Sequence, residues 1–173
     1  MTDRSWFDLL GTADLDALRS ARVGRLATLG NSGFPSVVPI CFALMGGPAP
    51  TIVSVLDDKP KGVPDEDLGR VRNILRHSQV GLTIDHYEED WTKLFYIQIR
   101  GIARMVAPDD AIHDACIALL RSKYPQYAAM DLERRSAIAI ESLRVRVWRA
   151  DRASLDDSLN GIANHSTAKD QPG

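Results

Sequence analysis

The chain is poor in cysteine and has no long hydrophobic run. Its 173 residues include only 2 cysteines, Cys41 and Cys116, which stand far apart in apolar contexts, so we predict reduced thiols rather than a disulfide framework. No apolar stretch approaches the ~20 residues that a membrane-spanning helix needs. The first residues also lack the apolar core of a secretory signal. We therefore expect a cytoplasmic protein with no membrane partner.

The chain also lacks an excess of positive charge. It has 21 Lys and Arg against 23 Asp and Glu, a net charge of −2, whereas binding to duplex nucleic acid needs a basic surface. The hydrophobic share of 45% and the charged share of 25% are ordinary for a globular chain. We predict one domain over residues 1–150, followed by a polar, loosely held tail over residues 151–173.

The motifs of several common enzyme classes are missing. There is no Gly-x-Gly-x-x-Gly after a strand, no Walker A sequence and no Gly-x-Ser-x-Gly elbow. The four histidines are scattered and neither cysteine has a partner at ligand spacing, so no metal site is predicted. An enzyme built on this chain would take its reactivity from a bound cofactor.

What the chain does contain is alternating apolar residues separated by short turns. This pattern predicts strands over residues 23–29, 34–44, 51–56, 80–85, 94–106 and 137–149. Helices are predicted after an N-cap at Thr12, over about 68–77, and along the apolar stripe from Ile112 to Leu120. Short connections favour antiparallel pairing. The predicted fold class is mainly β with peripheral helices, a small six-stranded antiparallel barrel.

The turn that follows the third predicted strand carries two lysines. Lys59 and Lys61 flank Pro60, and proline restricts both its own backbone and that of the residue before it. Two ammonium groups held apart at the end of a buried strand favour a phosphate or carboxylate ligand. The alternative is a solvated turn that keeps an edge of the sheet soluble.

Pro39 interrupts a predicted strand. Because proline cannot donate to a strand ladder, this strand should lie at an edge or carry a bulge there. One interpretation is protection against aggregation. The other is that the backbone around Pro39 faces the polar rim of a flat ring, with the segments 38–41 and 53–56 side by side. The lysine turn would then close the same crevice, which outlines a flavin-like ligand.

Taken in order, five segments carry a family resemblance: Val23–Leu29 with its glycine turn, Pro35–Pro39, Asp57–Lys61, Val71–Ile74 and Asp85–Trp91. Over roughly residues 15–148 the chain resembles the pyridoxamine-phosphate-oxidase-like, FMN-binding split β-barrel flavin and deazaflavin oxidoreductases. The nearest branch is the group that uses the deazaflavin coenzyme F420. The resemblance implies a homodimer with a cofactor crevice at the subunit interface.

The resemblance also implies roles for individual residues. Lys59 and Lys61 would hold the cofactor phosphate. Two short segments would cradle the ring, namely Val38, Pro39, Ile40 and Cys41 together with Ser54, Val55 and Leu56. Arg72 would be a second cation or simply a solvated helix residue. Trp91 would lie near the substrate or plug the barrel end, and Arg25 would line the crevice or point to solvent.

The activity that the resemblance implies is hydride transfer from reduced F420 to a conjugated small-molecule acceptor. Only His86 and Tyr87 are candidates for a proton donor. The alternatives are an FMN-dependent oxidoreductase or flavin reductase of the same fold, and a non-catalytic barrel that binds a cofactor or haem. The acids at 65–67 stand where the family often has basic residues, which argues against binding a polyglutamate tail.

Overall fold

The computed structural model describes residues 10–47, 50–57 and 64–150. Seven antiparallel strands form one sheet in the order β2-β1-β5-β6-β7-β4-β3. The strands are β1 (Gly24–Leu29), β2 (Pro35–Ile40), β3 (Ala43–Met45), β4 (Thr51–Val55), β5 (Gln79–His86), β6 (Phe95–Val106) and β7 (Ala137–Arg149). The helices are α1 (Thr12–Ser20), α2 (Gly69–Arg76) and α3 (His113–Lys123), with short 3₁₀ turns η2 (Asp65–Asp67), η3 (Trp91–Lys93) and η4 (Pro125–Ala129).

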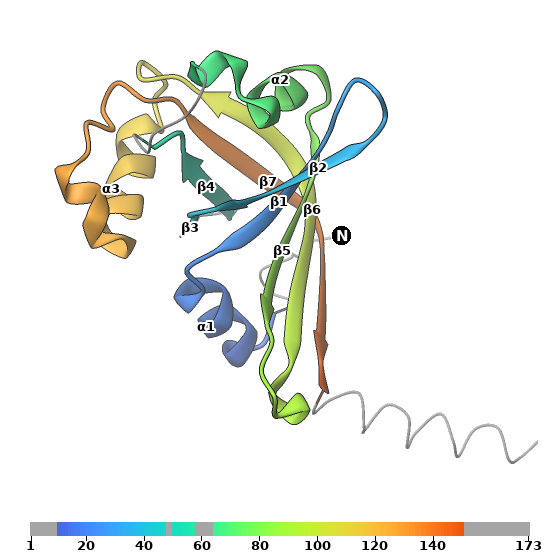
Figure 1. Cartoon of the computed structure of the whole chain (residues 1–173). Helices are drawn as coiled ribbons and strands as arrows, with labels where there is room; N and C mark the ends of the chain where they lie inside the picture. Colours follow the sequence, from blue (N-terminus) through green and yellow to red (C-terminus); the bar gives the residue numbers. More distant parts are fainter. Residues whose placement is uncertain (1–9, 48–49, 58–63, 151–173) are drawn as a thin grey trace, which may run out of the picture.

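The sheet is strongly curled (Figure 1), and apolar side chains fill its interior. Its two edge strands, β2 and β3, are separated in the chain only by Cys41 and Phe42, so the two edges of the sheet come together at one place. Leu26, Leu82 and Ile97 are fully buried inside the curl. The predicted split β-barrel, mainly β with peripheral helices, is confirmed.

One predicted strand is divided in two, which gives seven strands instead of six. Of the predicted run 34–44, the first part pairs with β1 and the last part with β4. Between them, the hydroxyl of Tyr124 accepts a hydrogen bond from the Phe42 N–H at 2.9 Å and lies 2.9 Å from the carbonyl oxygens of Phe42 and Arg22. Because a side chain takes up the polar backbone groups of Phe42, the strand ladder stops there.

The helices cover two different surfaces of the sheet. α1 and α2 close the interior of the curl, to which they contribute Leu18 and Ile74. α3 packs instead on the outer surface, where Leu120 joins a second apolar cluster with Val53 and Val55 of β4. In Figure 1, α3 accordingly lies beside β4, outside the barrel. The protein therefore has one core inside the sheet and one beneath α3.

A bulge divides β7 into two halves. Arg100 lies opposite Arg144, but the next residue, Gly101, lies opposite Ser142, so β7 carries one extra residue. Such a residue reverses the alternation of faces along a strand. A side chain at Gly101 would meet the Glu141 carbonyl oxygen at 2.3 Å, which explains the glycine.

The N-terminal helix differs in detail from the prediction. Gly11 is the N-cap and Thr12 the first helical residue. Asp14 is buried and accepts a hydrogen bond from Nε of Arg149 at 2.6 Å. A carboxylate in the first turn thus ties α1 to the end of β7. Across the described residues, no helix has both the length and the apolar character that a bilayer-spanning segment requires. The predicted tail, 151–173, lies outside the described residues.

Candidate functional site

Lys59 and Lys61 lie outside the described residues, but both flanks of their turn are described. On the N-terminal flank, Asp57 is buried, and its carboxylate accepts a hydrogen bond from the Tyr127 hydroxyl at 3.1 Å. Burial, reinforced by Cys41 and Asp57, raises the pKa of Tyr127. Tyr127 therefore remains a hydroxyl donor and holds Asp57 in place.

The C-terminal flank is held from the same part of the chain. The guanidinium of Arg135 donates to the Asp65 carboxylate at 2.9 Å. On the N-terminal flank, the neighbouring Ser136 carbonyl oxygen accepts from the Leu56 N–H at 3.0 Å. The two ends of the lysine turn are thus anchored on residues 127–136.

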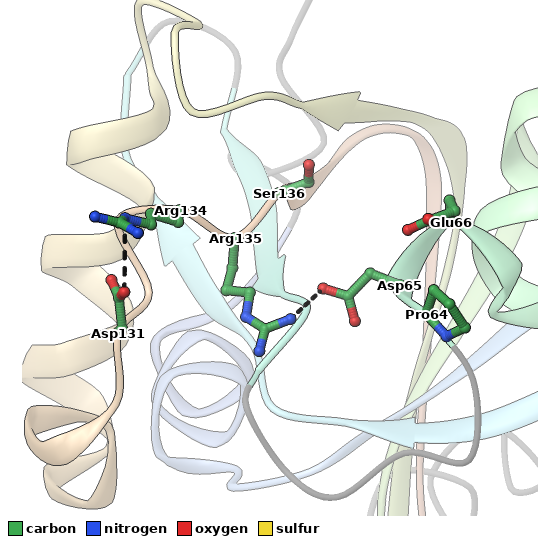
Figure 2. Close-up of a pocket in the computed structure, with 7 residues that line it drawn as sticks. All are labelled: Pro64, Asp65, Glu66, Asp131, Arg134, Arg135 and Ser136. Carbon is green, nitrogen blue, oxygen red and sulfur yellow. Dashed lines mark hydrogen bonds and ion pairs between the residues drawn. The ribbon is translucent and has the colours of Figure 1, made fainter.

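A hollow of about 550 Å³ lies at the described C-terminal flank, beside Pro64 and Asp65 (Figure 2). Arg135 reaches across it to Asp65, while Arg134 turns toward Asp131, with a closest approach of 3.8 Å. The lining residues are Pro64, Asp65, Glu66, Asp131, Arg134, Arg135 and Ser136. The lining thus carries three carboxylates and two guanidinium groups, and each guanidinium lies near one of these carboxylates.

The prediction for Pro39 is confirmed, because β2 is an edge strand of the described sheet. Pro39 is exposed and lies opposite Arg25 of β1. Val38 packs against the inner core and Ile40 is buried. Since β2 pairs only with β1 among the described strands, backbone groups along its other edge remain available to a ligand.

Segments 38–41 and 53–56 are not paired as neighbouring strands, although Val38, Ile40 and Leu56 share the inner cluster. The connection through Gly46 joins β3 to β4, so the partner of Val53 is Ala43. The break at Phe42 moves β3 to the opposite edge of the sheet, and only Cys41 packs against the cluster that holds Val53. The proposed ring-binding residues Ser54, Val55 and Leu56 are each no more than 5% exposed.

The remaining candidates lie at two other places in the fold. Arg72 is exposed on α2, without an ion pair to any described residue. Trp91 and Tyr87 are 66% and 71% exposed beyond the end of β5. The ring of His86 stacks on that of Phe95 with centroids 5.8 Å apart. In Figure 1, α2 lies at the top of the barrel, whereas η3 lies at its lower end. Within one chain, these aromatic residues are therefore separated from α2 and the preceding turn η2 by the length of the barrel.

A second hollow, of about 610 Å³, opens at this lower end. Arg25 and Asp85 form an ion pair at 3.2 Å in its wall, next to His86. Its lining is Ala17, Ser20, Ala21, Arg22, Val23, Arg25, Asp85, His86 and Phe95. The structure thus brings together Arg25 and His86, which the sequence singled out separately.

Sequence reasoning did not identify Arg134 and Arg135. Their signal is the basic pair directly before the last predicted strand, at the point where a strand begins. Within the described part of the chain, no group of three metal-ligating side chains occurs. Burial raises the pKa of the Cys116 thiol, so this cysteine is a core residue rather than a nucleophile.

Comparison with known proteins gives a consistent result. The profile of the pyridoxamine 5'-phosphate oxidase family matches residues 12–149. A search of curated proteins gave no significant match. Among solved structures, the conserved hypothetical protein Rv2991 from Mycobacterium tuberculosis has a TM-score of 0.65 at 20% identity, over 84% of this chain and 88% of that chain.

Two further structures share the fold. HutZ, the haem storage protein from Vibrio cholerae, has a TM-score of 0.57 at 13% identity, over 78% of this chain and 90% of its own. A candidate pyridoxamine 5'-phosphate oxidase from Listeria innocua has a TM-score of 0.54 at 19% identity, over 77% of this chain and 93% of its own. At such identities the likeness concerns the fold alone.

Proposed function

The chain belongs to the pyridoxamine 5'-phosphate oxidase family, and from this membership we propose that it is an oxidoreductase that uses coenzyme F420. It transfers a hydride from the reduced deazaflavin to a conjugated small-molecule acceptor. The observation that carries the proposal is the anchoring of both ends of the lysine turn, through Tyr127 to Asp57 and through Arg135 to Asp65. Because Cys41 and Cys116 are free thiols, we place this activity in the cytoplasm.

The side chains of the proposed site have two roles, binding the cofactor and positioning the groups that bind it. Lys59 and Lys61 bind the phosphate as point charges, and Arg135 keeps their turn in register through Asp65. The free edge of β2, at Val38 and Pro39, offers backbone groups to the polar rim of the ring. When bound, the reduced deazaflavin supplies the hydride, and the protein positions the acceptor and excludes water.

Proton donors, where the acceptor needs one, come from the lower end of the barrel. His86 lies 3.4 Å from Glu88 and its side chain is 47% exposed, so it can exchange protons with solvent. Tyr87 is exposed beside it. In the proposed homodimer, a second subunit contributes these residues to the cofactor site.

A homodimer also agrees with the apolar side chains on the uncovered sheet face. Val37 is 59% exposed, Leu29 40% and Trp148 38%, all on strands. A second copy of the chain would bury such residues. The cofactor crevice would then lie between subunits.

The proposal is tested by anaerobic titration of the purified protein with F420 and, separately, with FMN. We expect F420 to bind at one molecule per subunit, with a change in its fluorescence. In the Lys59→Ala/Lys61→Ala variant, binding should weaken by at least about tenfold, since each charge-assisted hydrogen bond contributes about 1.5–3 kcal/mol. We expect the variant to keep the circular dichroism of the wild type, which separates a loss of binding from a loss of the fold.

Arg76→Ala is the matched control, because Arg76 is an exposed cation at the far end of α2. It should leave the affinity unchanged. Tight FMN binding without an F420 response would contradict the choice of cofactor and favour the FMN-dependent alternative. Unchanged affinity in the lysine variant would favour the alternative that this turn only keeps an edge of the sheet soluble.

Haem binding without catalysis is the second candidate. It is favoured by the shared fold of HutZ, a haem storage protein. Titration with haemin, followed by its Soret absorbance, separates the two functions. Haem binding that competes with F420 for the same protein, without oxidation of reduced F420 by a panel of quinones and enones, would support storage over catalysis.

A further inference from the structure

Three arginines and a glutamine line a small hollow on the outer face of β6 and β7. Arg100 lies directly opposite Arg144, and Gln98 lies directly opposite Arg146. Since side chains two residues apart share a face, all four project from the same side of the sheet. The hollow between them measures about 130 Å³.

These three arginines differ from the other arginines in the strands. The strands contain six arginines in all. The other three each pair with a carboxylate: Arg25 with Asp85, Arg104 with Asp110, and Arg149 with Asp14. None of the three in the hollow forms an ion pair within the described part of the chain.

The arrangement opposes the usual pairing rules of a sheet. Like charges that lie directly opposite in an antiparallel pair are destabilising, yet Arg100 and Arg144 occupy such a position. The bulge opposite Gly101 also determines to which side Arg144 and Arg146 project. Without the extra residue in β7, the alternation set by Ile138 and Ile140 would turn Arg144 and Arg146 toward the core. The fold therefore uses a special backbone feature to present two arginines beside a third.

The chemistry of the four side chains is that of an oxyanion receptor. Guanidinium groups offer planar pairs of N–H donors that match the oxygens of a phosphoryl or carboxylate group. The amide of Gln98 adds two more N–H donors. A space of about 130 Å³ admits one such group but not a planar cofactor, so the rest of a larger ligand would remain outside.

We propose that Arg100, Arg144 and Arg146, together with Gln98, form an oxyanion-binding site for the phosphoryl or carboxylate group of a small molecule. This site is separate from the lysine turn and does not depend on the cofactor proposed above. A bound anion removes the repulsion between Arg100 and Arg144. If a second subunit covers this face, the anion also balances charges that would otherwise be buried without partners.

The test is thermal unfolding and calorimetric titration of the full chain at constant ionic strength. The ligands are inorganic phosphate and pyrophosphate in one arm, succinate and citrate in the other, and chloride serves as the reference anion. We expect saturable binding and a rise in Tm with at least one arm. The arm whose ligands bind more tightly shows whether the site prefers phosphoryl or carboxylate groups.

Two variants and two controls locate the bound anion. Arg100→Gln and Arg144→Gln should each weaken binding by about tenfold or more. Each should also raise the Tm in low-salt chloride, because the opposed charges are gone. Arg104→Gln, on the same face but paired with Asp110, should leave binding unchanged, as should Arg76→Ala at the exposed end of α2.

Three results would overturn the proposal. The first is the absence of saturable binding by any of the four oxyanions. The second is an equal loss of affinity in Arg104→Gln and Arg144→Gln. The third is a loss of self-association in Arg144→Gln without any anion dependence in the wild type, which would show that carboxylates of a second subunit are the partners of these arginines.

Discussion

The two halves of β7, before and after the bulge, differ in what covers their outer face. Before the bulge, the outer face carries Ala137 and Ala139, which are at most 2% exposed beneath α3. After the bulge, it carries Arg144, Arg146 and Trp148, over which no described helix lies. Small apolar side chains allow a helix to approach closely, whereas large charged ones do not.

The polar groups of the two regions also differ. Near α3, two buried polar side chains have partners: the His113 ring nitrogen Nε2 lies 2.8 Å from the Arg135 carbonyl oxygen, and Tyr124 hydrogen-bonds to the backbone of Phe42. On the bare half, the arginines of the hollow have none among the described residues. The covered half is thus organised for stability and the bare half for contact with something outside the chain.

The largest expected effect breaks the covered region. Leu120 of α3 is fully buried, so Leu120→Ala should lower the free energy of unfolding by about 3 kcal/mol. The matching change on the exposed part of the sheet is Leu29→Ala in β1. It should change that free energy by less than about 1 kcal/mol, since Leu29 is already 40% exposed. Urea unfolding of both variants measures the contrast. Equal losses would show that the bare face is as tightly packed as the covered one.

A smaller effect, of opposite sign, concerns Lys123 at the end of α3. Its Nζ is buried without a hydrogen bond to any described residue and lies 4.0 Å from the centre of the Phe42 ring. Burial lowers the pKa of Lys123 from 10.5 to about 8. Lys123→Met should therefore raise the free energy of unfolding at pH 7 by about 1 kcal/mol, because the loss of the cation–π contact offsets part of the gain.

The pH dependence of this variant follows from the same shift. Between about pH 8 and 10.5 the unfolded chain holds the lysine proton that the folded chain has lost, so the wild type gains stability as the pH rises. The advantage of Lys123→Met should shrink across this window. Unfolding measured at pH 7 and at pH 10 tests it, and an advantage that stays constant would contradict the buried charge.

The smallest effect on stability is expected on the bare face. Val37 is 59% exposed on β2, so Val37→Asp should change the free energy of unfolding by no more than about 0.5 kcal/mol. If the bare face is the proposed dimer interface, the same change should weaken self-association strongly in analytical ultracentrifugation. Ser32→Asp, in the turn beside β2, is the control and should leave association intact.

Much of the architecture could be predicted because each element is written in a local pattern. The turn 30–33 between β1 and β2 is confirmed, and Gly33 adopts a positive φ of 79°. The last strand was predicted with the observed bounds, Ala137–Arg149. In these cases a few neighbouring residues carry the whole signal.

What could not be predicted depends on contacts between distant segments. The break between β2 and β3 comes from Tyr124, which lies 82 residues after Phe42. The pairing of Arg100 with Arg144 depends on a cross-strand register and on a bulge, and neither leaves a mark in the pattern of a single strand. For the candidate site, the lysine turn was found from sequence, whereas its anchors, Tyr127 and Arg135, were not.

The most direct test of the account is hydrogen–deuterium exchange with and without saturating F420. The account predicts that the cofactor slows exchange in the lysine turn, in its flanks at Asp57 and Pro64, and along residues 35–41 of the bare side. Exchange in α3 should stay unchanged. Protection confined to α3 and the strands beneath it, with none at the lysine turn, would contradict the division between a covered, stabilising half and a bare, binding half.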